Sequence, residues 1–378
     1  MWIMNWEPYY YYQPVTRIGT ELQIATLRID DDGTLIFRDK HDGIQFDELM
    51  NNVLRLEELT SNTCQPQLAY YVFAITHRPT FMESYFPITK GLRKDARRQF
   101  HETITKVMLH PGFDLQLLAF GPNLIMHHPD FDRMSSNYSV DRIRLIPALS
   151  YLVAGHIVEM FFFRQDILDK LLQGGIRIWL YTDQDAFKAD GGVAGGCYNP
   201  RKGCVQLVVS RLFEGFNQPT PGAAPFIHEF GHLLDYFDAN KLQASRSSSG
   251  WLPGMRESDG TIYVSEAREA FIVGKRLEMD RYDRQVDKPD GSEPLPIGHP
   301  YVFQSNSEFI AGYLEMFFRN PHYFAAQNPD LFDGFTRLFK QDPRPYWEAD
   351  FPYYVHQNRT FYLSGQRLRV SGLKLDVD

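Results

Sequence analysis

The stretch PFIHEFGHLLDYFD, residues 225–238, decides what kind of fold the sequence predicts. Its apolar residues recur at helical spacing and Pro225 suits a first turn, so we expect a half-buried helix. His228 and His232 would present their rings on one face of it, about 6 Å apart along the axis. Glu229 would point about 100° away, where a general base for a metal-activated water would lie. The pattern predicts two metal ligands and a base, although two structural histidines could arise in it by chance.

A catalytic zinc needs a third protein ligand, and three downstream acids are candidates. Glu266 and Glu269 lie in SEAREAF, within a charge-rich helical stretch that is typical of a solvated face. Glu308 instead opens the strongly apolar stretch SNSEFIAGYLEMFF, where Ser305 or Ser307 could cap a helix. A carboxylate that is partly buried there needs a cation or hydrogen-bond donors, and zinc would meet that need.

Two further acids could support such a site. Asp235 follows His232 by three positions, so it either accepts the second N–H of a ligand histidine or faces solvent near the helix end. Glu315 shares a helix face with Glu308, and it is either a supporting partner of the ligands or the rival third ligand. Ala311 and Gly312 would leave room for close approach to the histidine helix.

These motifs carry a resemblance to a known family. HEFGHLLD followed by SNSEFIAGYLEMFFRNPHYFAAQNPDLFDGFTRLFKQDP resembles the Mlc titration factor family of zinc peptidases, which pair an HEFxHxLD helix with a later E-F-F-A-x-x-x-E-x-F-F-x-x-P stretch. It is also similar to the catalytic domain of anthrax lethal factor, a gluzincin-like zincin. The resemblance is firm from about Pro225 to Pro343, is a matter of general pattern from Leu145 to Ser210, and does not reach the first 130 residues. Ile310 and Gly312 depart from the family pattern.

The resemblance implies roles for two residues. Glu308 stands where the family has its third zinc ligand, and Tyr301 stands where a tyrosine lines the site and stabilises the transition state. Together with the residues themselves, this predicts a zinc metallopeptidase that hydrolyses a peptide or protein substrate, with Glu229 as general base. The alternative is a regulatory protein-binding module with a peptidase fold and little turnover, although such a module would need neither Glu229 nor Tyr301. Hydrolysis of a non-peptide amide is a third option.

The expected fold is α+β, with a zincin-like domain over residues 136–345 made of the histidine helix, the Glu308 helix and a small mixed sheet. Before it we expect an N-terminal α/β region over residues 1–135. After it we expect a β-rich tail over residues 346–378 that could pack on that N-terminal region. The elements predicted within these parts are a hairpin around a DDG turn in 15–47, a strand LAYYVFAITHRP, a helix over 92–109, a boundary run over 110–139, and strands over 174–182 and 204–210. The last of these strands could be an edge that pairs with an extended peptide, but its alternation of Val205, Leu207 and Val209 suits a half-buried strand equally well.

Composition narrows the functional classes. A net charge of −8 argues against nucleic-acid binding, which depends on a basic surface. The start of the chain shows no secretory pattern, and the three cysteines form no C-x-x-C motif, so we expect a cytoplasmic protein without a structural zinc site. The apolar run over 145–163 contains His156 and Glu159, which favours a buried helix over a membrane span.

Overall fold

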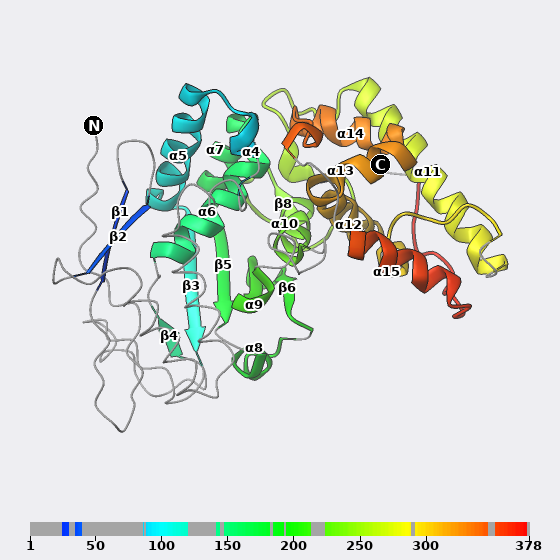
Figure 1. Ribbon diagram of the computed structural model, residues 1–378, viewed down its shortest axis with the longest axis horizontal. Helices are drawn as coiled ribbons and strands as arrows, with labels where there is room; N and C mark the ends of the chain where they lie inside the picture. Colours follow the sequence, from blue (N-terminus) through cyan, green and yellow to red (C-terminus); the bar gives the residue numbers. More distant parts are fainter. Residues whose placement is uncertain are drawn as a thin grey trace. The chain divides into compact units, whose positions relative to one another are not determined.

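The computed structural model describes residues 25–29, 35–39, 86, 88–119, 141–143, 147–181, 184–192, 194–212, 224–288, 292–346 and 352–375. The chain divides into two compact units. The first falls within residues 1–158, 177–197 and 206–212, and the second within residues 159–176, 198–205 and 213–378. Helices and strands occur together along the described chain (Figure 1), so the expected α+β class is confirmed.

The first unit contains a hairpin and a helix that the sequence predicted. Strands β1 (Ala25–Ile29) and β2 (Leu35–Asp39), which flank the DDG sequence, pair antiparallel. Helix α5 (Lys94–Leu109) buries Phe100, Ile104 and Val107 at helical spacing, which is why this charged segment folds as a helix. A short helix, α4 (Ile88–Gly91), precedes it. The predicted strand LAYYVFAITHRP lies outside the described residues.

A five-stranded sheet has the order β4-β3-β5-β7-β6. Its strands are β3 (Phe113–Ala119), β4 (Asp141–Ile143), β5 (Ile176–Tyr181), β6 (Gly196–Asn199) and β7 (Cys204–Val208). The strands expected over 174–182 and 204–210 are therefore present, although Val209–Leu212 form the short helix α9. Helix α8 (Gln184–Ala189) follows β5. Strand β3 lies within the run 110–139 that was expected to be a boundary.

Strand β7 is not a sheet edge, so that expectation was wrong. It lies between β5 and β6 in the sheet and is buried along its whole length. A strand that is covered on both faces reads as a nearly continuous apolar run, and CVQLV fits this better than half-buried alternation. Its backbone hydrogen bonds are used within the sheet rather than offered to a peptide.

Helix α6 (Pro147–Phe161) is the apolar run that resembled a membrane span. Near its end, Oε2 of Glu159 accepts a hydrogen bond of 3.0 Å from Nη2 of Arg319, and both side chains are buried. Removing one partner of such a buried pair typically costs about 3–5 kcal/mol, so the charge in this helix has a structural reason. Among the helices of the described residues, none has the length and apolar character needed to cross a membrane.

The second unit is mainly helical. Helix α10 packs against α12, and α11 packs against α14. Its α-helices are α7 (Gln165–Gly174), α10 (Pro225–Tyr236), α11 (Ser265–Asp287), α12 (Asn306–Arg319), α13 (Pro321–Gln327), α14 (Pro329–Phe339) and α15 (Pro352–Leu363). The short elements are strands β8 (Phe237–Asp238) and β9 (Gln243–Ala244) and 3-10 helices η2 (Pro253–Met255), η3 (Pro300–Gln304) and η4 (Arg344–Tyr346).

Phenylalanine rings fill the core between these helices. Phe317 of α12 lies 5.2 to 5.9 Å, between ring centroids, from Phe332, Phe335 and Phe339 of α14. Aromatic pairs at such distances add to the free energy gained by burial alone, by about 0.5–1.5 kcal/mol each. The apolar residues of α12 thus pack into the core, and this packing holds in place the helix that carries Glu308.

The tail expected to be β-rich is not. Within residues 352–375 the structure has helix α15 and then an irregular segment, with no strand. The alternation in FYLSGQRLRVSGLKLDV resembles a strand, but the first three of these residues end α15. After them, Arg369 accepts a hydrogen bond from α11 and Gly372 donates one to η3. The proposed packing of this tail on the N-terminal region, and the domain limits at 135 and 345, stay predictions.

Candidate metal centre

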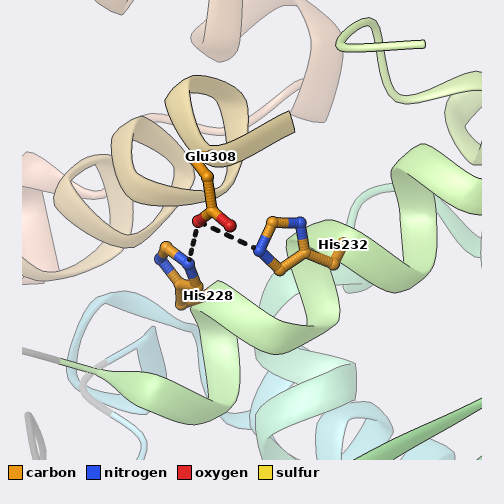
Figure 2. A group of neighbouring side chains, drawn as sticks. All are labelled: His228, His232 and Glu308. Carbon is orange, nitrogen blue, oxygen red and sulfur yellow. Dashed lines mark hydrogen bonds and ion pairs between the residues drawn. The ribbon is translucent and has the colours of Figure 1, made fainter. Parts of the chain in front are cut away.

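Three potential ligand atoms converge where α10 meets α12 (Figure 2). Oε2 of Glu308 lies 3.1 Å from Nε2 of His228 and 3.3 Å from Nε2 of His232. One ligand atom from each residue falls within 4.8 Å of the others. Among the described residues, these three form the group of histidine, cysteine and acidic side chains that could hold a metal ion.

Helix α10 presents its two histidines on one face because they are four positions apart. Their ring centroids are 4.9 Å apart, with the ring planes nearly perpendicular. Pro225 occupies the first turn, as predicted, and Phe226, Phe230 and Leu234 are fully buried. The burial of that face holds the helix in register and leaves the histidines directed towards α12.

The close approach of the two helices depends on small residues. A methyl group at Gly231 would lie 3.0 Å from Cα of Ala311, so the two backbones come close next to His232 and about one turn from Glu308. Ala311 thus has the spacing role expected of it. Gly312 does not, because a side chain there would overlap Val302 of η3 instead of α10.

The site favours positive charge at the point where the three residues meet. Burial raises the pKa of Glu308, but hydrogen bonds from His228 and His232 outweigh it and hold that pKa well below its usual range. Burial lowers the pKa of His228, but contacts with Glu308 and Glu315 outweigh it and raise the pKa to about 10. Carboxylates that stabilise an imidazolium here would stabilise a bound cation in the same way.

Glu229 lies on the neighbouring face of α10 and is partly buried. Burial raises the pKa of its carboxyl group, while the neighbouring His228 and His232 and a backbone hydrogen bond from Tyr198 lower it. The net shift is upward. A carboxyl group with a raised pKa is better suited to accept and return a proton near neutral pH.

Tyr301 reaches the same group from η3. Its hydroxyl donates a hydrogen bond of 3.0 Å to Oε1 of Glu308, whereas Oε2 is the oxygen that contacts both histidines. Its ring centroid is 6.4 Å from that of His228. Burial raises the pKa of the Tyr301 hydroxyl, and the negative charge of Glu308 raises it further, so the group remains a donor at neutral pH.

The second nitrogen of each histidine also has a partner. Nδ1 of His228 lies 3.4 Å from Oε2 of Glu315, whose Oε1 accepts a hydrogen bond of 2.6 Å from the backbone N–H of Ala224. Nδ1 of His232 lies 3.0 Å from Oγ of Ser307. Such partners fix the orientation of a ligand ring. Ser307 escaped the sequence analysis because it was weighed only as a helix cap, a role that Ser305 fills by accepting the N–H of Glu308.

Asp235 does not contact either histidine, contrary to one of the two expectations. It is fully buried, and its Oδ1 accepts hydrogen bonds from the backbone N–H groups of Trp251 and Leu252 and from the hydroxyl of Ser249. These three donors turn the carboxylate towards the 249–252 loop. The other expectation, exposure to solvent, is also wrong.

Glu266 and Glu269 are not brought to the site. Both are exposed on α11, and they are absent from the group of ligand atoms around Glu308. The exposure agrees with the solvated face that their charge-rich surroundings indicated.

Two imidazoles and a carboxylate around one point, with a second acid beside them, form the donor set of a metal-dependent hydrolase. Residues 182–340 match the model of a family described as glucose-regulated metallo-peptidase M90. The match confirms the resemblance to the Mlc titration factor family for this part of the chain, and it leaves residues 1–181 and 341–378 outside. No curated protein matches the chain.

Proposed function

We propose that the protein is a zinc-dependent peptidase with a zincin-like catalytic domain. The observation that carries the proposal is the convergence of His228, His232 and Glu308 from two helices, with ligand atoms within 4.8 Å. Two histidines and one glutamate are a donor set of catalytic zinc sites, in which a fourth position stays open to water. Glu308 and Glu315 raise the pKa of His228, and carboxylates that stabilise an imidazolium would also stabilise a zinc ion at this site.

When bound, zinc would supply a Lewis acid that activates water and polarises a peptide carbonyl. Glu229 would accept the proton of the attacking water at its carboxylate and then deliver it to the leaving amine nitrogen. The raised pKa of Glu229 supports this assignment, because the group must hold the proton between the two steps. The N–H of Tyr198 would keep the carboxylate directed.

Tyr301 would supply a hydrogen bond where charge develops. In the structure its hydroxyl donates to Oε1 of Glu308, one of the three candidate metal ligands. We infer that it donates to the carbonyl oxygen of the scissile bond as that oxygen becomes negative. Removing such a donor typically costs about 3 kcal/mol of transition-state stabilisation.

The first experiment is metal analysis together with peptide-library cleavage. The protein purified after metal-replete expression should hold about one zinc per chain and cleave peptides. Glu229→Gln should keep the zinc and lose turnover by about a thousandfold or more, because the proton acceptor is gone. The matched control is Glu266→Gln, which changes an exposed glutamate of α11 and should leave the rate unchanged.

The outcomes separate the candidate functions. Zinc with no cleavage of any peptide, and a Glu229→Gln variant that behaves like the wild type, would favour the regulatory protein-binding alternative. The absence of zinc would remove the site altogether. Cleavage of small amides but not of peptides would indicate the non-peptide hydrolase.

A further inference from the structure

The position of Tyr301 is set by its backbone. Its side chain is 45% exposed, and the hydrogen bond of its hydroxyl goes to the functional group itself, Oε1 of Glu308. Its ring centroid also lies 6.4 Å from that of His228. Both contacts depend on where the backbone of residues 297–304, which contains η3, places the side chain.

A second segment holds the beginning of that stretch. We call residues 358–374 the C-terminal strap; it comprises the second half of α15 and the irregular segment after it. The side-chain amide of Asn358 donates to the carbonyl of Ile297 at 3.2 Å, and the hydroxyl of Tyr362 donates to the carbonyl of Gly298 at 2.7 Å. Both hydrogen bonds are buried, so water does not compete for them.

The strap reaches Tyr301 through one intervening residue. The ring of Phe361 packs edge-on against His299, with centroids 5.2 Å apart, and Nδ1 of His299 accepts the N–H of Tyr301 at 3.1 Å. Burial lowers the pKa of His299, which favours the neutral ring that can accept at this nitrogen. Contact with α15 thus orients the group that caps the backbone of Tyr301.

The far end of the strap holds the end of η3. The N–H of Gly372 donates to the carbonyl of Phe303 at 2.9 Å, and the hydroxyl of Ser371 approaches the same oxygen at 3.3 Å. A side chain at Gly372 would overlap the carbonyl oxygen of Gln304. The approach of the two backbones therefore requires glycine at this position.

The strap is itself anchored to α11. The hydroxyl of Tyr282 donates to the carbonyl of Arg369 at 3.0 Å, while its ring stacks on Phe303 at 4.1 Å. Nζ of Lys275 donates to the carbonyl of Lys374 at 2.7 Å. Helix α11 and the strap therefore enclose η3 between them.

We propose that the C-terminal strap is a positioning element that holds Tyr301 against the metal centre and so makes turnover depend on residues outside the family match. The inference rests on the proposed role of Tyr301 in peptide hydrolysis. Its strap residues would act through the backbone of 297–304 without touching substrate. A displacement of about 1 Å at a catalytic group can cost about a hundredfold in rate, so loosening the strap should be visible in turnover.

The test uses two strap variants of the full chain. Tyr362→Phe removes one hydroxyl and is expected to fold, whereas Gly372→Val forces the strap away from Gln304. Both should lower kcat by about tenfold or more while the KM and the zinc content stay near wild type. The matched control is Val370→Ala, in the same segment, because Val370 is 83% exposed. In a Tyr301→Phe background the strap variants should cause no further loss of kcat.

Hydrogen exchange gives a readout that needs no turnover. Amides over residues 297–304 should exchange faster in both strap variants than in the wild type or in Val370→Ala. Unchanged exchange, a further loss of kcat in the Tyr301→Phe background, or loss of zinc in Tyr362→Phe would each overturn the inference. A wild-type protein that binds zinc without cleaving peptides would refute the proposed function, and the exchange result would still decide whether the strap holds the segment.

Discussion

Helices α11 and α12 both carry a glutamate in the first turn, yet the two acids have opposite surroundings. Glu266 of α11 is exposed, and no side chain caps that helix. Glu308 of α12 is partly buried, follows a serine cap and meets two imidazoles from α10. The residue type is the same, and both residues lie in the first turn of their helix. Removal from water and the arrival of a second helix are what turn one of these carboxylates into a candidate ligand.

The largest effect should come from removing the carboxylate of α12. Glu308→Ala should abolish both zinc binding and turnover, because a three-ligand site becomes a two-ligand site. Glu266→Ala and Glu269→Ala, which remove the exposed acids of α11, should keep about one zinc per chain. Metal analysis of the purified variants measures this, and the reverse pattern would place the third ligand on α11.

A variant of Tyr301 tests whether an exposed side chain near the metal centre can still be needed for turnover. Its side chain is 45% exposed, yet Tyr301→Phe should lower kcat by about a hundredfold to a thousandfold, because the variant lacks the proposed oxyanion donor. The zinc content should not change, since the hydroxyl contacts Oε1 of Glu308 rather than the shared Oε2. Steady-state kinetics with metal analysis tests both statements. A wild-type rate in this variant would show that Tyr301, like the exposed acids of α11, is not needed for turnover.

Glu315 is the second acid of α12, and its effect should be smaller. Glu315→Gln preserves the shape, but the amide cannot accept from both Ala224 and His228, so the ring of His228 loses part of its support. The zinc dissociation constant should rise by about tenfold to a hundredfold. Competition with a chelator measures it. Glu269→Gln on α11 is the matched control, and equal affinities in the two variants would contradict a supporting role.

A last prediction concerns stability rather than the metal centre, and it involves Lys275, which ties α11 to the first residue of α12 through Oδ1 of Asn306 at 2.9 Å. Burial lowers the pKa of Lys275 from 10.5 to about 8, against the attraction of Asp235. Between these pH values the unfolded chain binds a proton that the folded chain has lost, so the free energy of unfolding should rise with pH. The rise should be at most about 3 kcal/mol.

Denaturant titrations of the wild type and of Lys275→Met between pH 7 and pH 10 would check this effect. The stability difference between them should shift in favour of the wild type as the pH rises through about 8. Lys288→Met, which removes an exposed lysine at the end of α11, should show no such shift. A difference that is independent of pH would show that Lys275 keeps its ordinary proton affinity in the folded protein.

The sequence was sufficient for the parts of the site that depend on local periodicity. The spacing of His228 and His232 and the apolar surroundings of Glu308 predicted a pair of facing helices, and the structure brings these three residues together. The same reasoning failed for Asp235, because its partners, the backbone groups of Trp251 and Leu252, come from a loop whose path no periodicity encodes. Ser307 was missed because local sequence shows a possible cap but not a histidine 75 positions away.

For the secondary structure, too, local sequence predicted some elements, whereas features that depend on contacts with distant parts of the chain were missed. The hairpin, α5 and α10 were predicted because each is specified by a turn or by one amphipathic face. The C-terminal segment was mistaken for strands because alternation of apolar residues also results when an irregular chain packs side chains singly into another surface. The position of β7 inside the sheet depends on strand order, which a single strand does not reveal.

The distance along the chain between His228 and Glu308, 80 positions, has a thermodynamic consequence. Such a group of ligands exists only in the folded chain, so an ion bound there adds its binding free energy to stability by mass action. At a thousandfold excess over the dissociation constant the gain is about 4 kcal/mol. The ion would then act as a removable crosslink between α10 and α12. A chelator would loosen the contact of Gly231 with Ala311 as well as stop catalysis.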